Sequence, residues 1–320
     1  MRKSYLLVAA ALLVAASCQK NDNASSVEGI KYNPIDVVLS AAIEDVDTKV
    51  GYTEDAHALK AAWKAGDKIS LVAIDASGNV LSNDVFETTT AGASAKFSGK
   101  YSNPKGAVTV SVFYPALTEG DGSDAQPWRC ENDVLYSMEL GEKYISISSF
   151  GHKYQDVNAD PAFLSKSVVM KGEISDMSAF MSGAAKTTLK NTCYIIKTTV
   201  TLPSTVTKVS EVSLVASSSS ITVVGWTMVD DEFLSYYGGA TPNDYSTIST
   251  RLGNFAPASD GTVTAWMIGY VANKKEVTSG ETLTMSVTTD QGVISRVKTL
   301  ESNTTFEPNK IYRLTVDMTK

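Results

Sequence analysis

The chain has 320 residues, with 28 Lys and Arg against 35 Asp and Glu and a formal net charge of −7 at pH 7. This acidic balance argues against nucleic-acid binding, which needs concentrated positive charge. The length is sufficient for two domains of ordinary size, each with its own hydrophobic core.

The N-terminus has the pattern of an export signal. Arg2 and Lys3 precede an uncharged apolar run at positions 6–16, which as a helix of about 11 residues spans roughly half of a bilayer core. Small residues at 15–17 then precede Cys18, and this arrangement resembles the lipobox of bacterial lipoproteins, in which the chain is cut before the cysteine and the thiol is acylated. The usual pattern has Leu at the position of Ala15, so ordinary secretion is the alternative. We expect a signal peptide at 1–17 and a lipid at Cys18 that anchors the protein in the outer membrane.

The residues after Cys18 are polar. Gln19, Lys20, Asn21 and Asp22 resemble the short export tag of surface lipoproteins in some Gram-negative anaerobes. The alternative is a simple polar tether over 18–33. The first interpretation predicts display on the cell surface.

The rest of the chain has the periodicity of β-strands. Short runs rich in Val, Ile and Thr alternate with Gly, Asn, Asp, Ser or Pro. Two turns, 75–79 and 289–292, have the composition of hairpins. A helix is expected only at 176–190. Strands are expected at 35–43, 68–75, 108–114, 167–174, 192–202, 209–216, 263–269, 283–289 and 310–318.

Many short strands with regular turns predict a sandwich or a barrel. We expect an all-β protein with two antiparallel β-sandwich domains in tandem, at 34–180 and 181–320. Cys130 and Cys193 then fall in different domains. Neither belongs to a C-x-x-C motif, which disfavours metal and redox sites, and both an unpaired state and a disulfide remain open.

The order of several short motifs is similar to that of the fimbrillin family, the fimbrial subunits and fimbrillin-like surface lipoproteins of Gram-negative anaerobes. The similarity covers nearly the whole chain after the signal peptide. The motifs are 37–43 with Asp47-Thr48-Lys49, Trp63 to Ile69, Phe97-Ser98-Gly99, Val112 to Pro115, Leu189 to Lys197, 209–215 and Phe306 to Tyr312. The resemblance implies transthyretin-like sandwiches and a structural or adhesive role, with other fimbrial subunits or copies of the same chain as partners.

The resemblance also implies a way of assembly. Family members that build fimbriae are cut by a trypsin-like protease, lose their first strand and accept a strand from the next subunit. Here the removable strand is 35–43, the cut falls between Lys49 and Val50, and the donor is 310–318. Many shaft subunits have Arg at the position of Lys49. The protein would then be located in the fimbrium, and otherwise on the outer membrane as an uncut, non-polymerising lipoprotein.

The sequence has no clear catalytic signature. His57 and His152 are its two histidines, and neither accompanies a G-x-S-x-G motif. Asp230, Asp231 and Glu232 form the densest acidic cluster, which we interpret as a solvated loop. We expect no enzyme activity, no cofactor and no metal site.

One loop has the composition of a carbohydrate site. Trp226, Tyr236, Tyr237 and Tyr245 lie close together in a Gly-containing stretch with carboxylates nearby. Exposed aromatic rings can stack on sugars, so a glycan or another host-surface ligand is the alternative partner. The competing interpretation is that these rings cover one end of a sandwich.

Overall fold

The computed structural model describes residues 34–43, 53–55, 58–60, 62–116, 118–119, 128–129, 134–138, 145–149, 154–155, 157–161, 163–164, 168–223, 226–227, 244–271 and 274–320. Contacts between Cα atoms divide the chain into Met1–Tyr32 and Asn33–Lys320, and the described residues all belong to the second unit. Strands dominate these ranges, which confirms the all-β prediction, and α1 (Met177–Met181) is their only α-helix. No helix within them is long and apolar enough to cross a membrane.

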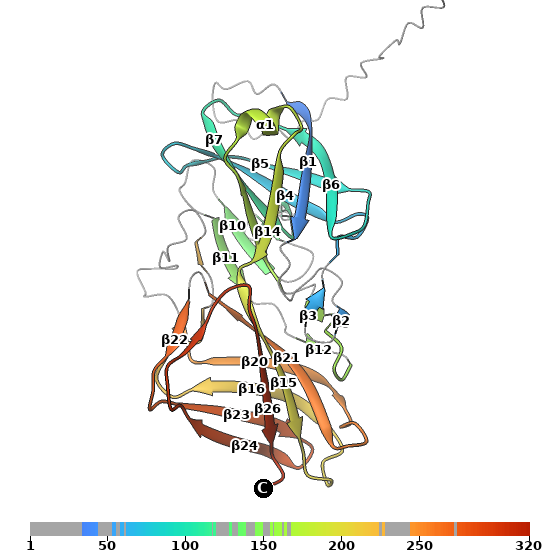
Figure 1. Cartoon of the computed structure of the whole chain (residues 1–320), viewed down its shortest axis with the longest axis vertical. Coiled ribbons are helices and arrows are strands. Elements are labelled where there is room, and N and C mark those ends of the chain that lie inside the picture. Colours follow the sequence, from blue (N-terminus) through green and yellow to red (C-terminus); the bar gives the residue numbers. More distant parts are fainter. Residues whose placement is uncertain are drawn as a thin grey trace, which may run out of the picture. The chain divides into compact units, whose positions relative to one another are not determined.

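The first half forms a closed barrel (Figure 1). Its strands follow the order β1-β14-β13-β7-β4-β5-β6. They are β1 (Ile35–Ile43), β4 (Lys68–Asp75), β5 (Val80–Thr88), β6 (Ser94–Tyr101), β7 (Ala107–Tyr114), β13 (Met170–Ile174) and β14 (Lys186–Asn191). Closure leaves no free edge in this sheet, and alternate side chains of every strand fill the interior.

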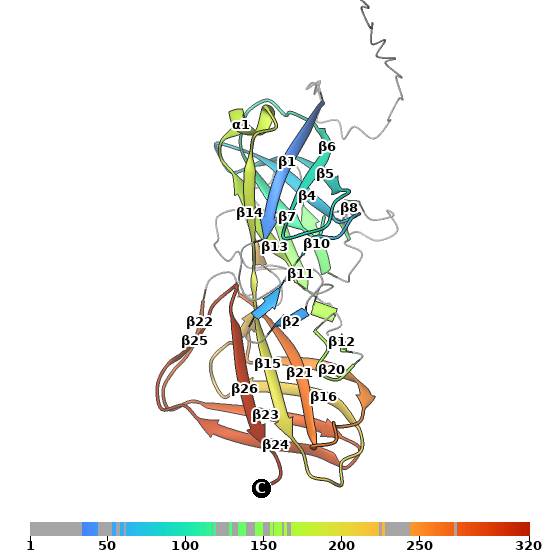
Figure 2. The ribbon, with the colours of Figure 1, turned by 45° about the vertical axis from the view of Figure 1, so that its right-hand side comes forward.

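The second half has two main sheets that share one core (Figure 2). One has the order β12-β20-β16-β23-β24 and the other the order β21-β15-β26. Their strands are β12 (Tyr154–Gln155), β15 (Cys193–Thr201), β16 (Val209–Ala216), β20 (Thr247–Phe255), β21 (Thr262–Tyr270), β23 (Thr282–Thr289), β24 (Gly292–Thr299) and β26 (Ile311–Asp317). Buried aliphatic side chains of both sheets belong to the same core cluster, as in two packed sheets.

Shorter strands form the remaining sheets. They are β2 (Thr53–Asp55) with β3 (Ala58–Lys60), β22 (Lys275–Val277) with β25 (Thr304–Phe306), β17 (Thr222–Val223) with β19 (Asp244–Tyr245), and a sheet of β8 (Thr118–Glu119), β9 (Trp128–Arg129), β10 (Val134–Met138), β11 (Ile145–Ser149) and β18 (Trp226–Thr227).

The expected helix at 176–190 is correct only at its start. The Asp176 side chain accepts a hydrogen bond from Ala179 N at 2.9 Å and caps α1, which ends at Met181. Residues from Lys186 to Asn191 are strand β14, with the buried positions Thr187, Leu189 and Asn191 alternating with exposed ones. The helix prediction is therefore wrong beyond residue 181, because tertiary pairing outweighs local propensity there.

Strand direction also departs from the expected antiparallel arrangement. Most pairs are antiparallel, but three are parallel: β1 with β14, β26 with β15, and the short β12 with β20. Residues 186–201 form one extended run interrupted only at Thr192. The first half of this run pairs with β1, the first described strand, and its second half pairs with β26, the last one. Sheet partners therefore change between Asn191 and Cys193, whereas the division at 180/181 into two transthyretin-like domains stays a prediction.

Candidate functional site: the first strand and its groove

Most residues that the sequence predicts as sites lie outside the described residues. These are the lipidation site Cys18, the cleavage site Lys49 and Val50, and the loop residues Tyr236 and Tyr237. The same holds for His57, His152 and the acidic run 230–232. All of them stay predictions.

Trp226 and Tyr245 are described through their strand pairing. Trp226 in β18 pairs with Ile147 of β11, and Tyr245 in β19 pairs with Thr222 of β17. The two positions thus belong to different sheets. The prediction of a shared glycan platform is not tested by this pairing.

The described site with the clearest functional geometry is β1 in the barrel. Its side chains alternate between the core and the surface: Val37, Leu39 and Ala41 are 3%, 0% and 0% exposed, whereas Val38 is 41% exposed. Fully burying an aliphatic side chain of this kind contributes about 1.5–3 kcal/mol. The buried face of β1 is therefore a substantial part of the barrel core.

Both edges of β1 are occupied. On one side it pairs antiparallel with β6 from Ile35 opposite Tyr101 to Ala42 opposite Ser94. On the other side its second half pairs in parallel with β14, from Ser40 to Ile43. Ser40 N also donates to Ala185 O at 3.3 Å, so the connection between α1 and β14 adjoins the strand. Removal of β1 would therefore leave two strand edges and an apolar slot without partners.

Trp63 anchors the second half of β1 to the barrel. Its indole Nε1 donates to Ala41 O at 3.0 Å, and its side chain is completely buried. The ring makes edge contacts with Phe97 and Tyr114, at centroid distances of 4.9 and 5.3 Å. Main-chain hydrogen bonds to Gly92 in both directions fix its position. Trp63 is therefore a core anchor and not an exposed ligand platform.

The barrel interior also contains a buried polar group. The Asp84 carboxylate, on the inner face of β5, accepts hydrogen bonds from Ser82 Oγ at 3.1 Å, from Ser102 N at 3.1 Å and from Ser102 Oγ. Burial raises the pKa of Asp84 above its ordinary value, and the Ser102 and Ser82 bonds oppose that rise. Polar residues inside the barrel explain why β5 was not among the expected strands.

Tyr101 lies beside this group, opposite Ile35. Its ring packs edge-on against Phe180 of α1 at 4.8 Å, and its hydroxyl has no hydrogen-bond partner among the described residues. Burial raises the pKa of Tyr101, and the charge of Asp84 raises it further. Next to the start of β1, the Tyr101 ring is therefore held by its apolar contact with Phe180, and its hydroxyl makes no hydrogen bond with the described residues.

The last strand, β26, is positioned differently. It pairs with β15 alone, so its outer edge has no strand partner in the described part of the chain. Tyr312, Leu314 and Val316 pack on the second core but are only partly buried, and Arg313 and Thr315 are exposed. β26 thus contributes to its own core from the edge of a sheet.

Tyr312 holds the start of β26 in place. Its hydroxyl donates to Thr305 O at 2.8 Å and accepts from Glu307 N at 2.9 Å. Its ring meets Phe306 and Tyr194 at centroid distances of 5.1 and 5.9 Å. Burial is the main cause of a raised pKa of Tyr312.

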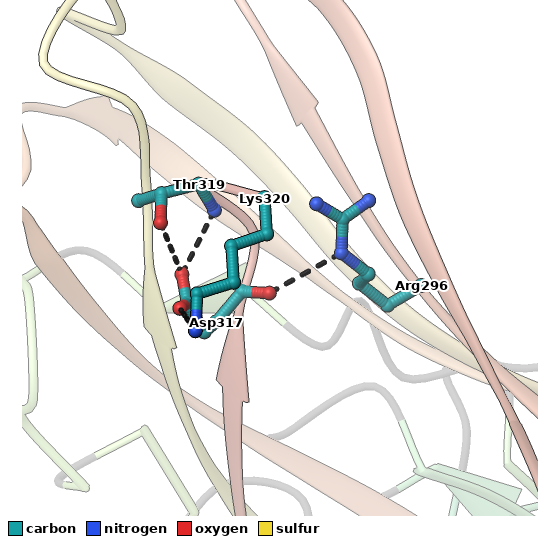
Figure 3. A network of polar contacts seen from close by, with 4 residues as sticks. All are labelled: Arg296, Asp317, Thr319 and Lys320. Carbon is teal, nitrogen blue, oxygen red and sulfur yellow. Dashed lines mark hydrogen bonds and ion pairs between the residues drawn. The ribbon is translucent and has the colours of Figure 1, made fainter.

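A polar network holds the other end of β26 (Figure 3). Arg296 Nε of β24 donates to Asp317 O at 3.3 Å, and Thr319 donates from N and Oγ1 to Asp317 Oδ1 at 2.9 and 2.6 Å. Lys320 Nζ is 3.7 Å from Asp317 Oδ2. The Thr319 hydrogen bonds lower the pKa of Asp317. Because these groups are exposed, the network stabilises the strand only weakly.

The described residues contain no group of three or more His, Cys, Asp or Glu side chains placed to hold a metal ion. The Asn158 side chain binds the backbone of β21: its Oδ1 accepts a hydrogen bond from Thr264 N at 2.8 Å. The chemistry that the site offers is strand pairing and apolar burial.

Comparison with known proteins gives structural neighbours alone. No model of a known protein family and no curated protein sequence matches the chain. A solved structure from Bacteroides uniformis, provisionally named a cell adhesion protein, covers 93% of this chain and 94% of its own length at 13% identity and a TM-score of 0.45.

Two further solved structures are named as fimbrial proteins. A fimbrial assembly protein from Parabacteroides distasonis covers 88% of this chain and 91% of its own length, at 11% identity and a TM-score of 0.40. The fimbrial anchor protein Mfa2 from Porphyromonas gingivalis covers 83% of both chains, at 16% identity and a TM-score of 0.32. The chain is thus similar to structures named for adhesion and fimbriae and not for enzymes, at a level that by itself assigns no function.

Proposed function

We propose that this chain is a non-catalytic structural subunit of a surface fimbria, which assembles by exchange of its first strand and is anchored to the outer membrane through Cys18. The observation that carries the proposal is the geometry of β1. It is the first described strand, it fills a slot in a closed barrel, and Lys49 follows its end at Ile43 by a few residues.

Strand exchange is physically favourable at such a slot. A barrel that has lost β1 presents unpaired N–H and C=O groups on β6 and β14, together with the apolar surface that covered Val37 and Leu39. An extended segment from another subunit satisfies both requirements, because its main chain pairs with the edges and its alternate side chains fill the slot.

The donor end of the proposed subunit is β26. It lies at a sheet edge, it alternates apolar Tyr312, Leu314 and Val316 with polar residues, and its final residues are held by an exposed network. To donate, β26 must leave β15 and its own core, so donation competes with folding of the second half. The same chain without cleavage at Lys49 would remain a non-polymerising surface lipoprotein, with the loop around Trp226, Tyr236, Tyr237 and Tyr245 as its ligand site.

N-terminal sequencing and intact mass of the protein from the surface of its native cells test the proposal. A chain that begins at Val50 and occurs in detergent-resistant, high-mass ladders supports it. The variant Lys49→Ala should abolish the ladders, whereas the matched variant Lys31→Ala should leave them unchanged. An acylated monomer that begins at Cys18 in wild-type cells would overturn strand exchange and favour the ligand-binding alternative.

A further inference from the structure

We propose that the β1 groove selects its occupant by size, because it requires a small side chain at the position of Ala41, and that a different subunit, rather than a second copy of this chain, supplies the strand. This inference rests on the proposed strand exchange and adds the chemistry of the partner.

Two small side chains lie opposite each other where β1 pairs with β6. Ala41 is completely buried, and its neighbour across the β1–β6 pair is Ala95, which is also buried. Two adjacent alanines on the inner face leave room for a large ring. The Trp63 indole occupies this region, because its Nε1 lies 3.0 Å from Ala41 O and its ring contacts Phe97, the next inward residue of β6.

The Trp63 indole also determines where an occupant must lie along the groove. Without β1, the buried Trp63 N–H would have no acceptor, which is costly in a protein interior. An incoming strand must therefore place a carbonyl where Ala41 O now lies. This hydrogen bond fixes the register of the incoming strand. The register in turn determines which of its side chains fills the space of the Ala41 side chain.

The proposed donor strand of this chain differs from β1 in its inward side chains. β1 presents Val37, Leu39 and Ala41 inward, whereas β26 presents Tyr312, Leu314 and Val316 to its own core. Residues 303–320 contain no Ala, Gly or Ser. No register and no direction of the C-terminal strand can therefore supply the small side chain, since every choice adds at least two heavy atoms beside the buried indole.

A second copy also cannot supply the strand through its own β1. Cleavage after Lys49 releases β1 from its subunit, so a β1 peptide in another groove would link nothing. The fitting partner is a subunit whose donor strand carries aliphatic residues at two alternate positions and Ala, Gly or Ser at the next one. This chain would then occupy a position next to an unlike subunit.

The test uses the full chain with Cys18→Ser, to prevent acylation, and with a specific protease site between Ile43 and Thr53. After the cut and removal of the β1 fragment in mild denaturant, the chain is refolded with synthetic peptides in competition with a fluorescent β1 peptide. The peptides are wild-type β1, β1 with Ala41→Val, the matched control β1 with Val38→Ile, and the C-terminal strand 310–318. Val38 faces solvent, so enlarging it should have little effect.

We expect the Ala41→Val and 310–318 peptides to bind at least about tenfold more weakly than wild-type β1, and the Val38→Ile peptide to bind within about threefold of it. In the 310–318 peptide, Tyr312→Val together with Val316→Ala restores the Val–Leu–Ala spacing. This double variant should bind at least about tenfold more tightly than the Tyr312→Val peptide.

A further variant tests the role of the indole. Trp63→Phe in the cut chain removes the N–H and part of the ring, and it should reduce the preference for wild-type β1 over the Ala41→Val peptide to within about threefold. Equal binding of the 310–318 and β1 peptides, or an unchanged affinity of the Ala41→Val peptide, would overturn the size selection while leaving strand exchange intact. Failure of every peptide to bind, including wild-type β1, would overturn strand exchange and this inference together.

Discussion

The first and last described strands, β1 and β26, both pair in parallel with the extended run of residues 186–201, but their inward side chains are buried to different degrees. β1 pairs in parallel with β14 and antiparallel with β6, and its inner face is fully buried. β26 pairs in parallel with β15 alone, and its apolar residues are only partly buried. The comparison shows that a terminal strand can be an internal component of a barrel or an edge component of a sheet. Removal of the first type leaves two strand edges unpaired, here those of β6 and β14, whereas removal of the second type leaves one, here that of β15.

The largest expected effect on stability comes from truncating a leucine, which is buried in β1 and partly exposed in β26. Leu39→Ala should lower the free energy of unfolding by about 2–5 kcal/mol, because it leaves a cavity in the barrel. Leu314→Ala in β26 should cost clearly less, since that side chain is partly exposed. Urea unfolding monitored by circular dichroism measures both. Equal costs would show that β26 is as integral to its core as β1.

Tyr312 at the start of β26 and Tyr101 opposite the start of β1 test whether a tyrosine hydroxyl stabilises each strand. Tyr312→Phe removes the bonds to Thr305 O and Glu307 N and should cost about 0.5–1.5 kcal/mol. Tyr101→Phe should be neutral or slightly stabilising, because its buried hydroxyl has no hydrogen-bond partner among the described residues. Denaturant midpoints of the two variants check this order. A destabilising Tyr101→Phe would mean that the start of β1 depends on the hydroxyl.

The buried Asp84 carboxyl group makes barrel stability depend on pH. Burial raises the pKa of Asp84, so the folded state binds its proton more tightly than the unfolded state does. The contribution of this group is fully present below its unfolded pKa and is lost as pH rises through the higher folded value. The Asp84→Asn variant should remove this component, and the difference from wild type should change across that window. A constant difference from pH 3 to pH 8 would contradict the raised pKa.

The smallest effect is expected at the C-terminal network. Arg296→Ala removes the bond to Asp317 O, but the groups are exposed, so global unfolding should not change measurably. Hydrogen exchange of the β26 amides should nevertheless become faster, while exchange in β1 stays unchanged. Unchanged exchange in β26 would show that Tyr312 and the apolar contacts alone hold the strand.

The sequence predicted the elements whose patterns are local. β1, β4 and β16 begin and end at the expected residues, and the hairpin turns that join β4 to β5 and β23 to β24 lie where Gly78 and Gly292 supply a positive φ. β5 was not predicted because Ser82 and Asp84 face inward and interrupt its apolar alternation. β14 was assigned to a helix because its parallel partner, β1, is distant in the sequence.

In the candidate site, too, local sequence patterns predict the strand but not its long-range contacts. Alternation within β1 identifies Ala41 as an inward residue, and its small size next to Val37 and Leu39 was a visible signal. Nothing local connects Ala41 to Trp63, which is 22 positions away, and nothing local places Ala95 opposite Ala41.

The sequence by itself therefore determined the all-β class, the positions of the strongest strands and turns, and the order of motifs on which the fimbrillin resemblance depends. Only the tertiary structure decided that β1 closes a barrel, that β26 lies at the edge of a sheet, and that both strands pair in parallel with residues 186–201. The reason is physical: strand formation and turns depend on side-chain alternation over a few residues, whereas partner, direction and depth of a strand depend on contacts between residues more than 100 positions apart.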